Sequence, residues 1–161
     1  MKIGVPAEIK NNEFRVGLVP AGVRELVRHG HTVMVETNAG AGIGHLDADY
    51  AVAGAEIVAT AEEIFARAEM IIKVKEPQAS ERKMLRPEQT LFTYLHLAPD
   101  LAQTSDLVNS GAICIAYETV TDAFGRLPLL APMSEVAGRM SIQAGAMCME
   151  KSHGGRGILL G

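Results

Sequence analysis

The stretch Ile71-Ile72-Lys73-Val74-Lys75-Glu76-Pro77 is a short apolar run that carries two lysines and stops at a proline. Apolar runs of this length are typical of strands inside a parallel sheet, which is covered on both faces. A lysine in or just after such a run is costly to bury unless its ammonium reaches water or has a function. Because ligands of open α/β sheets bind outside the carboxyl ends of the strands, we predict that Lys75 borders a binding site.

Two further side chains suit the same site. The next predicted strand, 90–95, ends at His96, and the loop after the first predicted strand contains Arg15. An arginine can hold a carboxylate through two hydrogen bonds, a lysine can bind a carbonyl oxygen or a carboxylate, and a histidine commonly transfers protons near neutral pH. Together, Arg15, Lys75 and His96 indicate a site for a small oxo acid or amino acid.

Each of these residues also has a purely structural interpretation, which the sequence leaves open. Arg15 could be a surface residue that pairs with Glu8 or Glu13. Lys75 could extend its ammonium into water from the strand end, and His96 could be a hydrogen-bonded core histidine. The functional hypothesis therefore depends on the combination of the three residues.

Apolar runs and capping residues alternate strands with helices along the chain. Strands are predicted at 2–5, 32–36, 56–58, 71–77, 90–95 and 112–116. Helices are predicted at 20–30, 47–54, 60–68, 80–85, 100–111 and 134–152, with N-caps at Thr60, Ser80 and Ser134. This alternation predicts an α/β fold with a doubly wound, mostly parallel sheet of the flavodoxin-like or Rossmann-like type.

Composition and charge narrow the functional classes. The chain has 161 residues, which suggests one domain, and its 48% apolar and 4% aromatic residues predict an aliphatic core. The net charge of −4 argues against a nucleic-acid partner, because phosphate binding needs a basic face. No apolar run of about 18 residues and no signal-peptide core occurs, so we expect a cytoplasmic protein with no membrane partner.

Neither a metal nor a dinucleotide loop is indicated. Cys114 and Cys148 lie in apolar surroundings without C-x-x-C spacing, which predicts buried free thiols, and no H-E-x-x-H motif occurs. The stretch Gly40-Ala41-Gly42-Ile43-Gly44 follows a predicted strand but lacks the G-x-G-x-x-G spacing of a dinucleotide-binding loop. We therefore predict a structural role for these glycines.

Several segments resemble one known family. The opening stretch from Gly4 to Val23, GVPAEIKNNEFRVGLVPAGV, is similar to the N-terminal signature of the alanine dehydrogenase and pyridine nucleotide transhydrogenase family. The resemblance continues in GHLDADY at 44–50, AGA at 53–55, KVKEP at 73–77 and YLHLA at 94–98. It covers essentially the whole chain, and the long opening signature is highly specific.

The resemblance to the alanine dehydrogenase branch implies an activity and a set of catalytic residues. It implies reversible oxidation of L-alanine by NAD and water to pyruvate, ammonium and NADH. Arg15 and Lys75 match positions that hold the substrate, and Lys75 and His96 match catalytic positions. The histidine would act as the acid and base while water adds to the imine and ammonia leaves.

The resemblance also implies the borders of the pocket. Tyr94, Glu118 and Met133 match positions that line or border it. Ser134 matches a position that contacts the NAD cofactor from a hinge helix, while NAD is bound mainly by residues outside this chain. No residue is implied as a metal ligand.

Proteins of this family are roughly twice as long as this chain, as two domains require. We therefore expect 1–133 to be the substrate domain, 134–152 a hinge helix, and 153–161 the start of a loop toward a nucleotide-binding domain. We expect this chain to be inactive by itself and to self-associate, and the longer protein to be a homo-oligomer, a hexamer by resemblance. Two alternatives stay open: a transhydrogenase subunit, which passes hydride between NADH and NADP, and a non-catalytic module that binds small oxo acids.

Overall fold

The computed structural model describes residues 1–160 of the chain. The chain divides into two compact units, Met1–Tyr117 and the part that begins at Glu118. The first unit contains the sheet and five α-helices, and the second contains the long helix α6 (Ala131–Met149) and the short 3-10 helix η3 (Lys151–His153).

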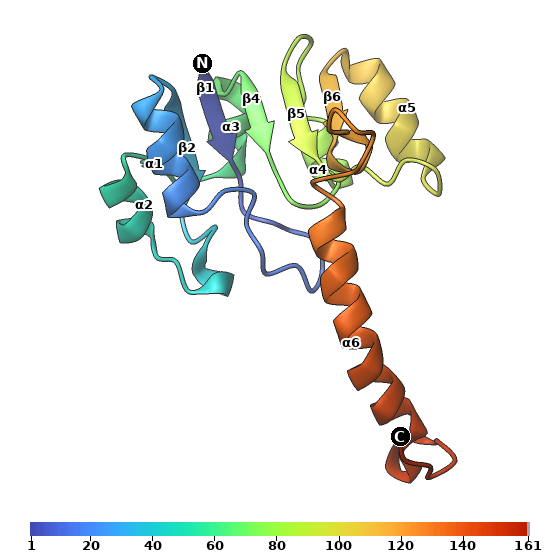
Figure 1. Cartoon of the computed structure of the whole chain (residues 1–161). Coiled ribbons are helices and arrows are strands. Elements are labelled where there is room, and N and C mark those ends of the chain that lie inside the picture. The colour runs from blue at the N-terminus through green and yellow to red at the C-terminus, as the bar shows by residue number, and fades with distance from the viewer. Residues whose placement is uncertain (161) are drawn as a thin grey trace. The chain divides into compact units, whose positions relative to one another are not determined.

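A six-stranded sheet forms the centre of the first unit (Figure 1). Its strands are β1 (Lys2–Val5), β2 (Thr32–Glu36), β3 (Glu56–Val58), β4 (Met70–Ile72), β5 (Thr90–Thr93) and β6 (Ile113–Ala116). Every neighbouring pair is parallel, in the order β3-β2-β1-β4-β5-β6. The predicted α/β class is confirmed, and the strand order is that of Rossmann-like folds.

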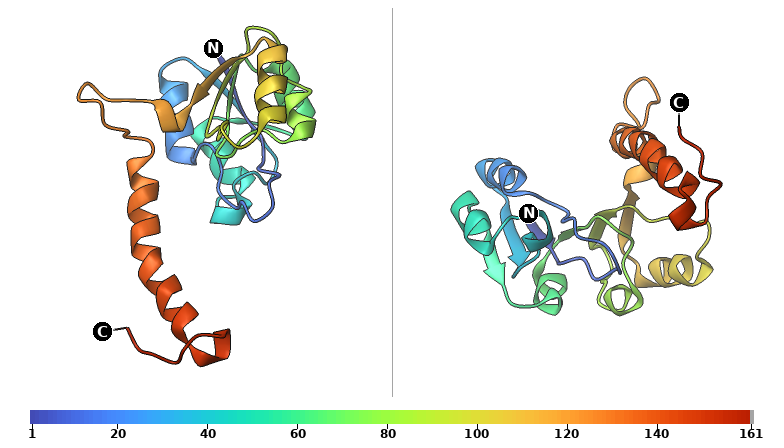
Figure 2. Two further views of the ribbon diagram at one scale, coloured as in Figure 1. Left: turned by 90° about the vertical axis from the view of Figure 1, so that its right-hand side faces the viewer. Right: turned by 90° about the horizontal axis from the view of Figure 1, so that it is seen from below.

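The helices of the first unit cover the two faces of the sheet. They are α1 (Pro20–Arg28), α2 (Asp47–Ala53), α3 (Ala61–Arg67), α4 (Ala79–Arg82) and α5 (Leu101–Ser110). Helices α1 and α2 lie on one face, and α3, α4 and α5 lie on the other (Figure 2). The chain thus moves toward one edge from β1 to β3 and toward the other edge from β4 to β6. The point where this direction reverses lies between β1 and β4, which is where open α/β sheets bind their ligands.

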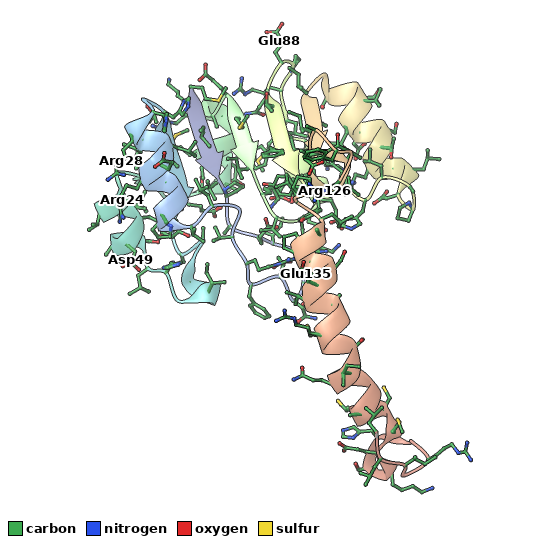
Figure 3. All side chains as sticks on the ribbon, viewed as in Figure 1. Arg24, Arg28, Asp49, Glu88, Arg126 and Glu135 are labelled. Carbon is green, nitrogen blue, oxygen red and sulfur yellow. The ribbon has the colours of Figure 1, made fainter. Side chains whose placement is uncertain are left out.

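Alternation of side chains along the strands produces one apolar cluster on each face. In β2, Val33 and Val35 belong to the cluster that includes Val23 of α1, while Met34 belongs to the opposite cluster with Ile64 of α3. This period of two is the strand periodicity, and it explains why the central strands are apolar throughout. The polar face of α1 is exposed, with Arg24 and Arg28 on its outer side (Figure 3).

Several predicted helix ends are confirmed. The hydroxyl of Thr60 accepts a hydrogen bond from the backbone N–H of Glu63 at 3.3 Å and caps α3. Gly54 and Gly111 end α2 and α5 in the left-handed conformation that favours glycine. Asp100 caps α5 by accepting from the backbone N–H of Gln103 at 2.8 Å.

The predicted strand 71–77 is too long, because β4 ends at Ile72 and both lysines lie beyond it. The backbone N–H of Lys73 still donates to the carbonyl of Phe92 on β5. The N–H of Val74 instead donates to the carboxylate of Glu8, because strand β1, the other neighbour of β4, already ends at Val5. The segment therefore leaves its pairing with β1 at Val74, while its pairing with the β5 side continues, because the N–H of Tyr94 donates to the carbonyl of Val74 at 3.2 Å.

Two predicted N-caps are wrong. The cap of α4 is Gln78 rather than Ser80, and Glu81 closes its first turn by accepting from the backbone N–H of Gln78. Helix α6 begins at Ala131, three residues before Ser134, with Pro132 in its first turn, where a missing N–H costs nothing. The hydroxyl of Ser134 donates to the carbonyl of Leu130 from within the helix.

The two cysteines are free thiols, as predicted, but they are not buried. Cys114 is half-buried on β6, where burial raises the pKa of its thiol. Cys148 is exposed on α6, so the prediction of a buried thiol there is wrong. No helix within residues 1–160 combines the length and apolarity needed to cross a membrane.

Candidate functional site

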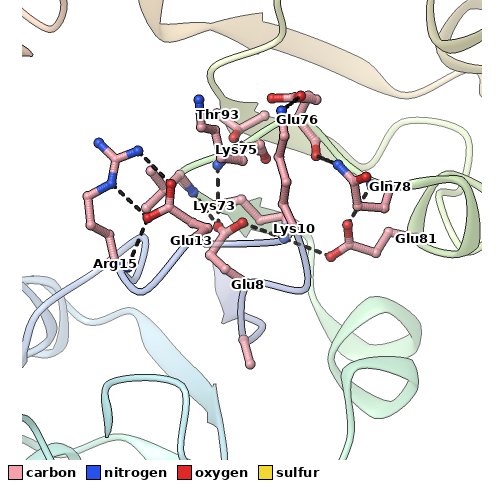
Figure 4. A network of polar contacts seen from close by, with 12 residues as sticks. Glu8, Lys10, Glu13, Arg15, Lys73, Lys75, Glu76, Gln78, Glu81 and Thr93 are labelled. Atoms are coloured by element: carbon pink, nitrogen blue, oxygen red, sulfur yellow. Dashed lines mark hydrogen bonds and ion pairs between the residues drawn. The ribbon is translucent and has the colours of Figure 1, made fainter. Parts of the chain in front are cut away.

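The candidate site lies at the carboxyl edge of the sheet, at the reversal between β1 and β4. Three chain segments meet there: the loop 6–19 between β1 and α1, the segment 73–78 between β4 and α4, and the end of β5 from Tyr94 onward. Figure 4 shows charged side chains from the first two segments joined in one network. The parallel sheet places these segments together because the carboxyl ends of its strands share one edge.

A buried cluster of opposite charges lies at the base of this network. The Nζ atom of Lys73 lies 3.2 Å from Oε2 of Glu8 and 2.7 Å from Oε1 of Glu81. Lys73 and Glu81 are almost fully buried, and the side chain of Glu8 is 2% exposed. Burial raises the pKa of Glu8, while the charge of Lys73 and the backbone N–H of Val74 act against the rise. Lys73 is therefore structural, as its place in the apolar run suggests.

Lys75, two residues further on, is held by its backbone rather than by its side chain. Its N–H points to Oε1 of Glu8 at 3.4 Å, and its carbonyl accepts from the hydroxyl of Thr93 at 2.8 Å. Lys75 is half-buried, and its ammonium makes no ion pair or hydrogen bond with any residue in the described part of the chain. An ammonium without an ion pair in the fold is suited to an anionic or carbonyl ligand.

The guanidinium of Arg15 lies against Glu13. Its Nε donates to Oε1 of Glu13 at 2.8 Å and its Nη2 donates to Oε2 at 2.6 Å. The pairing of Arg15 with Glu13, which is its structural interpretation, is thus present in the fold. The hydrogen bond from Arg15 lowers the pKa of Glu13 to about 2, and the charge of Lys75 acts in the same direction. Glu13 therefore links Arg15 electrostatically to Lys75.

We expect the Arg15–Glu13 pair to stabilise the fold only while Glu13 is ionised. The pKa of Glu13 is about 2 in the fold against an ordinary value of 4.5, so the unfolded chain takes up this proton at higher pH. The stabilisation is complete above the ordinary value and is lost as the pH falls toward about 2. Because the side chain of Arg15 is 44% exposed, we expect a contribution of only about 1 kcal/mol.

Denaturant unfolding of the native chain and of Glu13→Gln, followed from about pH 6 to about pH 3, measures this contribution. The difference in unfolding free energy should be largest near neutral pH and should shrink with acidification. A difference that stays constant with pH would contradict stabilisation by the Arg15–Glu13 ion pair. Only the native chain has a carboxylate at position 13 that loses its charge on acidification.

His96 follows the end of β5 and lies beside Glu76. Its Nδ1 lies 3.7 Å from Oε2 of Glu76, whose other oxygen, Oε1, accepts from the ammonium of Lys10. Burial acts to raise the pKa of Glu76, but Lys10 and Lys75 outweigh it and the net pKa is lowered. His96 also has a φ of +48°, a region that is uncommon outside glycine, although asparagine, aspartate and histidine occupy it more often than other residues. Residues in this region are frequent at functional sites.

An aromatic group lies next to His96. The ring of Tyr94 lies 6.2 Å from the imidazole of His96 and makes an edge contact with Tyr117 at 4.9 Å. Tyr117 in turn makes an edge contact with Phe92 at 4.3 Å. Burial raises the pKa of Tyr117 above its ordinary value. Tyr94, a predicted pocket residue, therefore lies beside the predicted acid–base residue.

Glycines allow the first loop to reach the sheet edge. A Cβ on Gly17 would lie 2.6 Å from the carbonyl oxygen of Ile72, and a Cβ on Gly42 would lie 2.6 Å from the carbonyl oxygen of Phe14. Real side chains essentially never approach backbone so closely. Gly17 thus lets the loop pack on the end of β4, and Gly42 lets the glycine-rich stretch support the backbone next to Arg15.

Comparisons with known proteins identify the family of this chain. A family model described as "Alanine dehydrogenase/PNT, N-terminal domain" matches residues 4–137. The chain belongs to the alanine dehydrogenase/PNT family. Among members of the family, an alanine dehydrogenase of Halomonas elongata is 59% identical over 99% of this chain, and one of Methanococcus maripaludis is 58% identical over all of it.

Solved structures support the same family. A structure named L-alanine dehydrogenase matches the whole chain with a TM-score of 0.91 and 54% identity, and the match covers 44% of that structure. A transhydrogenase from Sinorhizobium meliloti matches 77% of this chain with a TM-score of 0.72 and 27% identity, over 35% of its own length. The chain spans 43% of the length of the curated alanine dehydrogenases that it matches.

The other predicted site residues of this family member lie in the second unit. Met133 and Ser134 belong to the first turns of α6, and Glu118 belongs to a 3-10 turn, η2 (Tyr117–Thr119). Met133 and Glu118 are half-buried, whereas Ser134 is exposed. Their roles at the pocket and at the cofactor remain predictions.

The described residues do not fit the pyrophosphate of a dinucleotide. In Rossmann folds this group sits on a tight glycine-rich turn after the first strand, at a helix N-terminus. Here the long loop 6–19 separates β1 from α1, so no tight glycine-rich turn leads from the first strand into a helix. Within residues 1–160, no group of three or more His, Cys, Asp or Glu side chains is arranged to hold a metal.

Three features of the candidate site were not predicted from the sequence. They are the Glu8–Lys73–Glu81 cluster, the placement of Glu76 beside His96, and the hydroxyl of Thr93 on the Lys75 carbonyl. One signal could have suggested the cluster, because a lysine within a buried run requires an anionic partner. Nothing in the sequence says which of the many carboxylates supplies it.

Proposed function

We propose that this chain is the substrate-binding part of an NAD-dependent L-alanine dehydrogenase, which interconverts L-alanine with pyruvate and ammonium. The observation that carries the proposal is Lys75 at the sheet edge, a half-buried residue whose ammonium makes no ion pair or hydrogen bond within residues 1–160 and whose charge acts on both Glu13 and Glu76. The high identity to alanine dehydrogenases over the whole chain supports alanine as the substrate.

The chain's own side chains suggest how a small oxo acid would bind. Arg15 presents a guanidinium suited to a carboxylate, once the substrate carboxylate replaces or joins Glu13. Lys75 would hold the carbonyl oxygen of pyruvate or a carboxylate oxygen and stabilise negative charge there. His96 would take and return protons at the substrate nitrogen and at the attacking water. NAD, when bound, supplies the hydride acceptor, and we infer that most of its contacts come from residues outside this chain.

The proposal predicts that pyruvate binds this chain through Lys75 and Arg15. Lys75→Gln and Arg15→Gln should each raise the Kd of pyruvate at least about tenfold, because a hydrogen bond to a charged group contributes about 1.5–3 kcal/mol. The measurement is an NMR titration of the ¹⁵N-labelled chain with pyruvate, and then with L-alanine. Lys2→Gln is the matched control, since Lys2 is an exposed lysine at the amino end of β1, the opposite edge of the sheet.

The same titration separates the alternatives. A transhydrogenase subunit needs no amino-acid pocket, and the Sinorhizobium meliloti likeness makes it the second candidate. If neither pyruvate nor alanine shifts the NMR signals of Lys75, Tyr94 or His96, the dehydrogenase proposal is overturned and the transhydrogenase subunit is favoured. A non-catalytic oxo-acid module would bind pyruvate equally well, but this chain joined to a nucleotide-binding domain would then show no NADH oxidation with pyruvate and ammonium.

Three further expectations belong to this proposal. A cytoplasmic location, a homo-oligomeric longer protein and the hexameric state remain predictions. Exposed apolar side chains on α6, among them Val136, Met140 and Ile142, are the reason to expect self-association of this chain. Light scattering that shows a monodisperse monomer would contradict that expectation.

A further inference from the structure

The proposed substrate contacts do not account for one buried carboxylate, that of Glu8. Glu8 and Glu81 share one cation, Lys73, so the cluster has one negative charge in excess when all three groups are ionised. Excess buried charge is costly, and apolar side chains of similar size often stabilise a core as well or better. Stability alone is therefore a poor reason for two glutamates at this place.

The two carboxylates differ in the backbone that they hold. Glu81 accepts from the N–H of Gln78 at 2.7 Å and closes the first turn of α4. Glu8 accepts from the N–H of Val74 at 2.6 Å and approaches the N–H of Lys75 at 3.4 Å. Of the two carboxylates, only that of Glu8 thus contacts the backbone N–H groups of Val74 and Lys75.

We propose that Glu8 is a positioning residue for Lys75: its carboxylate, held by Lys73, fixes the backbone from which the Lys75 ammonium reaches the substrate. This inference rests on the proposed function for the role of Lys75. Thr93 completes the arrangement from β5, because its hydroxyl donates to the Lys75 carbonyl at 2.8 Å. The peptide groups on both sides of Lys75 are therefore fixed from two different strand ends.

The physical reason is the loss of the β1 side of the sheet ladder after Ile72, since hydrogen bonds to the β5 side continue through Val74. Strand β1 ends at Val5, so it offers no carbonyl to the N–H of Val74, and Glu8 replaces that acceptor. Without Glu8, the N–H of Val74 would have no acceptor on the side of the segment 73–78 that faces β1. A displacement of about 1 Å at a group that orients substrate can reduce the rate about a hundredfold.

The test compares two matched variants of this chain. Glu8→Met and Glu81→Met each leave Lys73 with one glutamate, so each removes the excess charge, but only Glu8→Met removes the acceptor at Val74. We expect Glu8→Met to raise the Kd of pyruvate about tenfold or more and to accelerate amide hydrogen exchange at Val74 and Lys75. Glu81→Met should change neither quantity appreciably. Glu8→Gln keeps an acceptor oxygen, so its Kd of pyruvate and its amide exchange at Val74 and Lys75 should stay close to those of the native chain.

A double-mutant cycle distinguishes positioning from general loss of structure. In the Lys75→Gln background, Glu8→Met should have little further effect on pyruvate affinity, because the group that it positions is absent. Equal effects of Glu8→Met in both backgrounds would overturn the proposal, as would unchanged exchange at Val74. If Glu8→Met does not fold, Thr93→Val takes its place in the cycle with Lys75→Gln, because Thr93 holds the carbonyl side of Lys75. Additive effects of Thr93→Val and Lys75→Gln on pyruvate affinity would also count against positioning.

The outcomes separate this inference from the proposed function. If pyruvate does not bind the native chain, the proposed function fails, while exchange at Val74 and Lys75 still reports whether Glu8 fixes this backbone. If pyruvate binds through Lys75 but Glu8→Met binds it equally well, the proposed function stands and the positioning role of Glu8 is wrong.

Discussion

Replacing Lys73 by methionine is expected to lower the free energy of unfolding by about 3–5 kcal/mol, the range for removing one partner of a buried ion pair. The substitution keeps the apolar stem of the side chain but leaves Glu8 and Glu81 buried, with no cation in ion-pair contact. The loss should shrink as the pH falls, because a protonated carboxyl group carries no charge for burial to penalise. Urea unfolding of both proteins at several pH values measures it.

Two controls test this explanation of the Lys73 effect. Lys83→Met changes an exposed lysine at the end of α4 and should stay within about 0.5 kcal/mol of the native chain. The triple variant Lys73→Met/Glu8→Gln/Glu81→Gln removes all three charges and should recover much of the loss. If Lys73→Met lowers the free energy of unfolding by less than about 1 kcal/mol, the three groups of the cluster do not form the buried ion pairs described above.

Gly17→Ala is expected to lower stability by about 1–3 kcal/mol, the usual cost of inserting a methyl group where no space exists. The new Cβ would lie 2.6 Å from the carbonyl oxygen of Ile72 and 3.0 Å from the Cα of Lys73, and both are backbone atoms that cannot rotate away. The loop that carries Glu8, Glu13 and Arg15 must therefore shift away from β4. Thermal or denaturant unfolding measures the stability, and NMR shifts at Val74 report the displacement.

Gly138→Ala is the matched control for Gly17→Ala. Gly138 lies within α6, where an added Cβ meets nothing within 4 Å. Alanine is the better helix former by about 0.5–1 kcal/mol, so this change should be neutral or stabilising. If Gly17→Ala behaves like Gly138→Ala, the close approach of the first loop to β4 does not limit the fold.

Most of the fold follows from local patterns. The apolar runs at 2–5, 32–36 and 56–58 predicted three strands that the structure has at those residues. Thr60, Gly54 and Gly111 mark helix ends because their capping chemistry acts over only a few residues. The N-caps predicted at Ser80 and Ser134 are wrong because Gln78 and Pro132 offered competing starts that the serine pattern overlooked.

The sequence by itself determined that charged and proton-active residues follow strand ends, because strand and loop patterns are local and parallel strands share one carboxyl edge. Only the tertiary structure decided what each lysine of the run 71–77 does. Lys73 is buried between Glu8 and Glu81, whereas the ammonium of Lys75 makes no ion pair within residues 1–160 and its backbone N–H reaches Glu8, a residue 67 positions away in the chain. Such pairings are set by the packing of loop 6–19 on β4, and local sequence carries no record of which distant carboxylate arrives there.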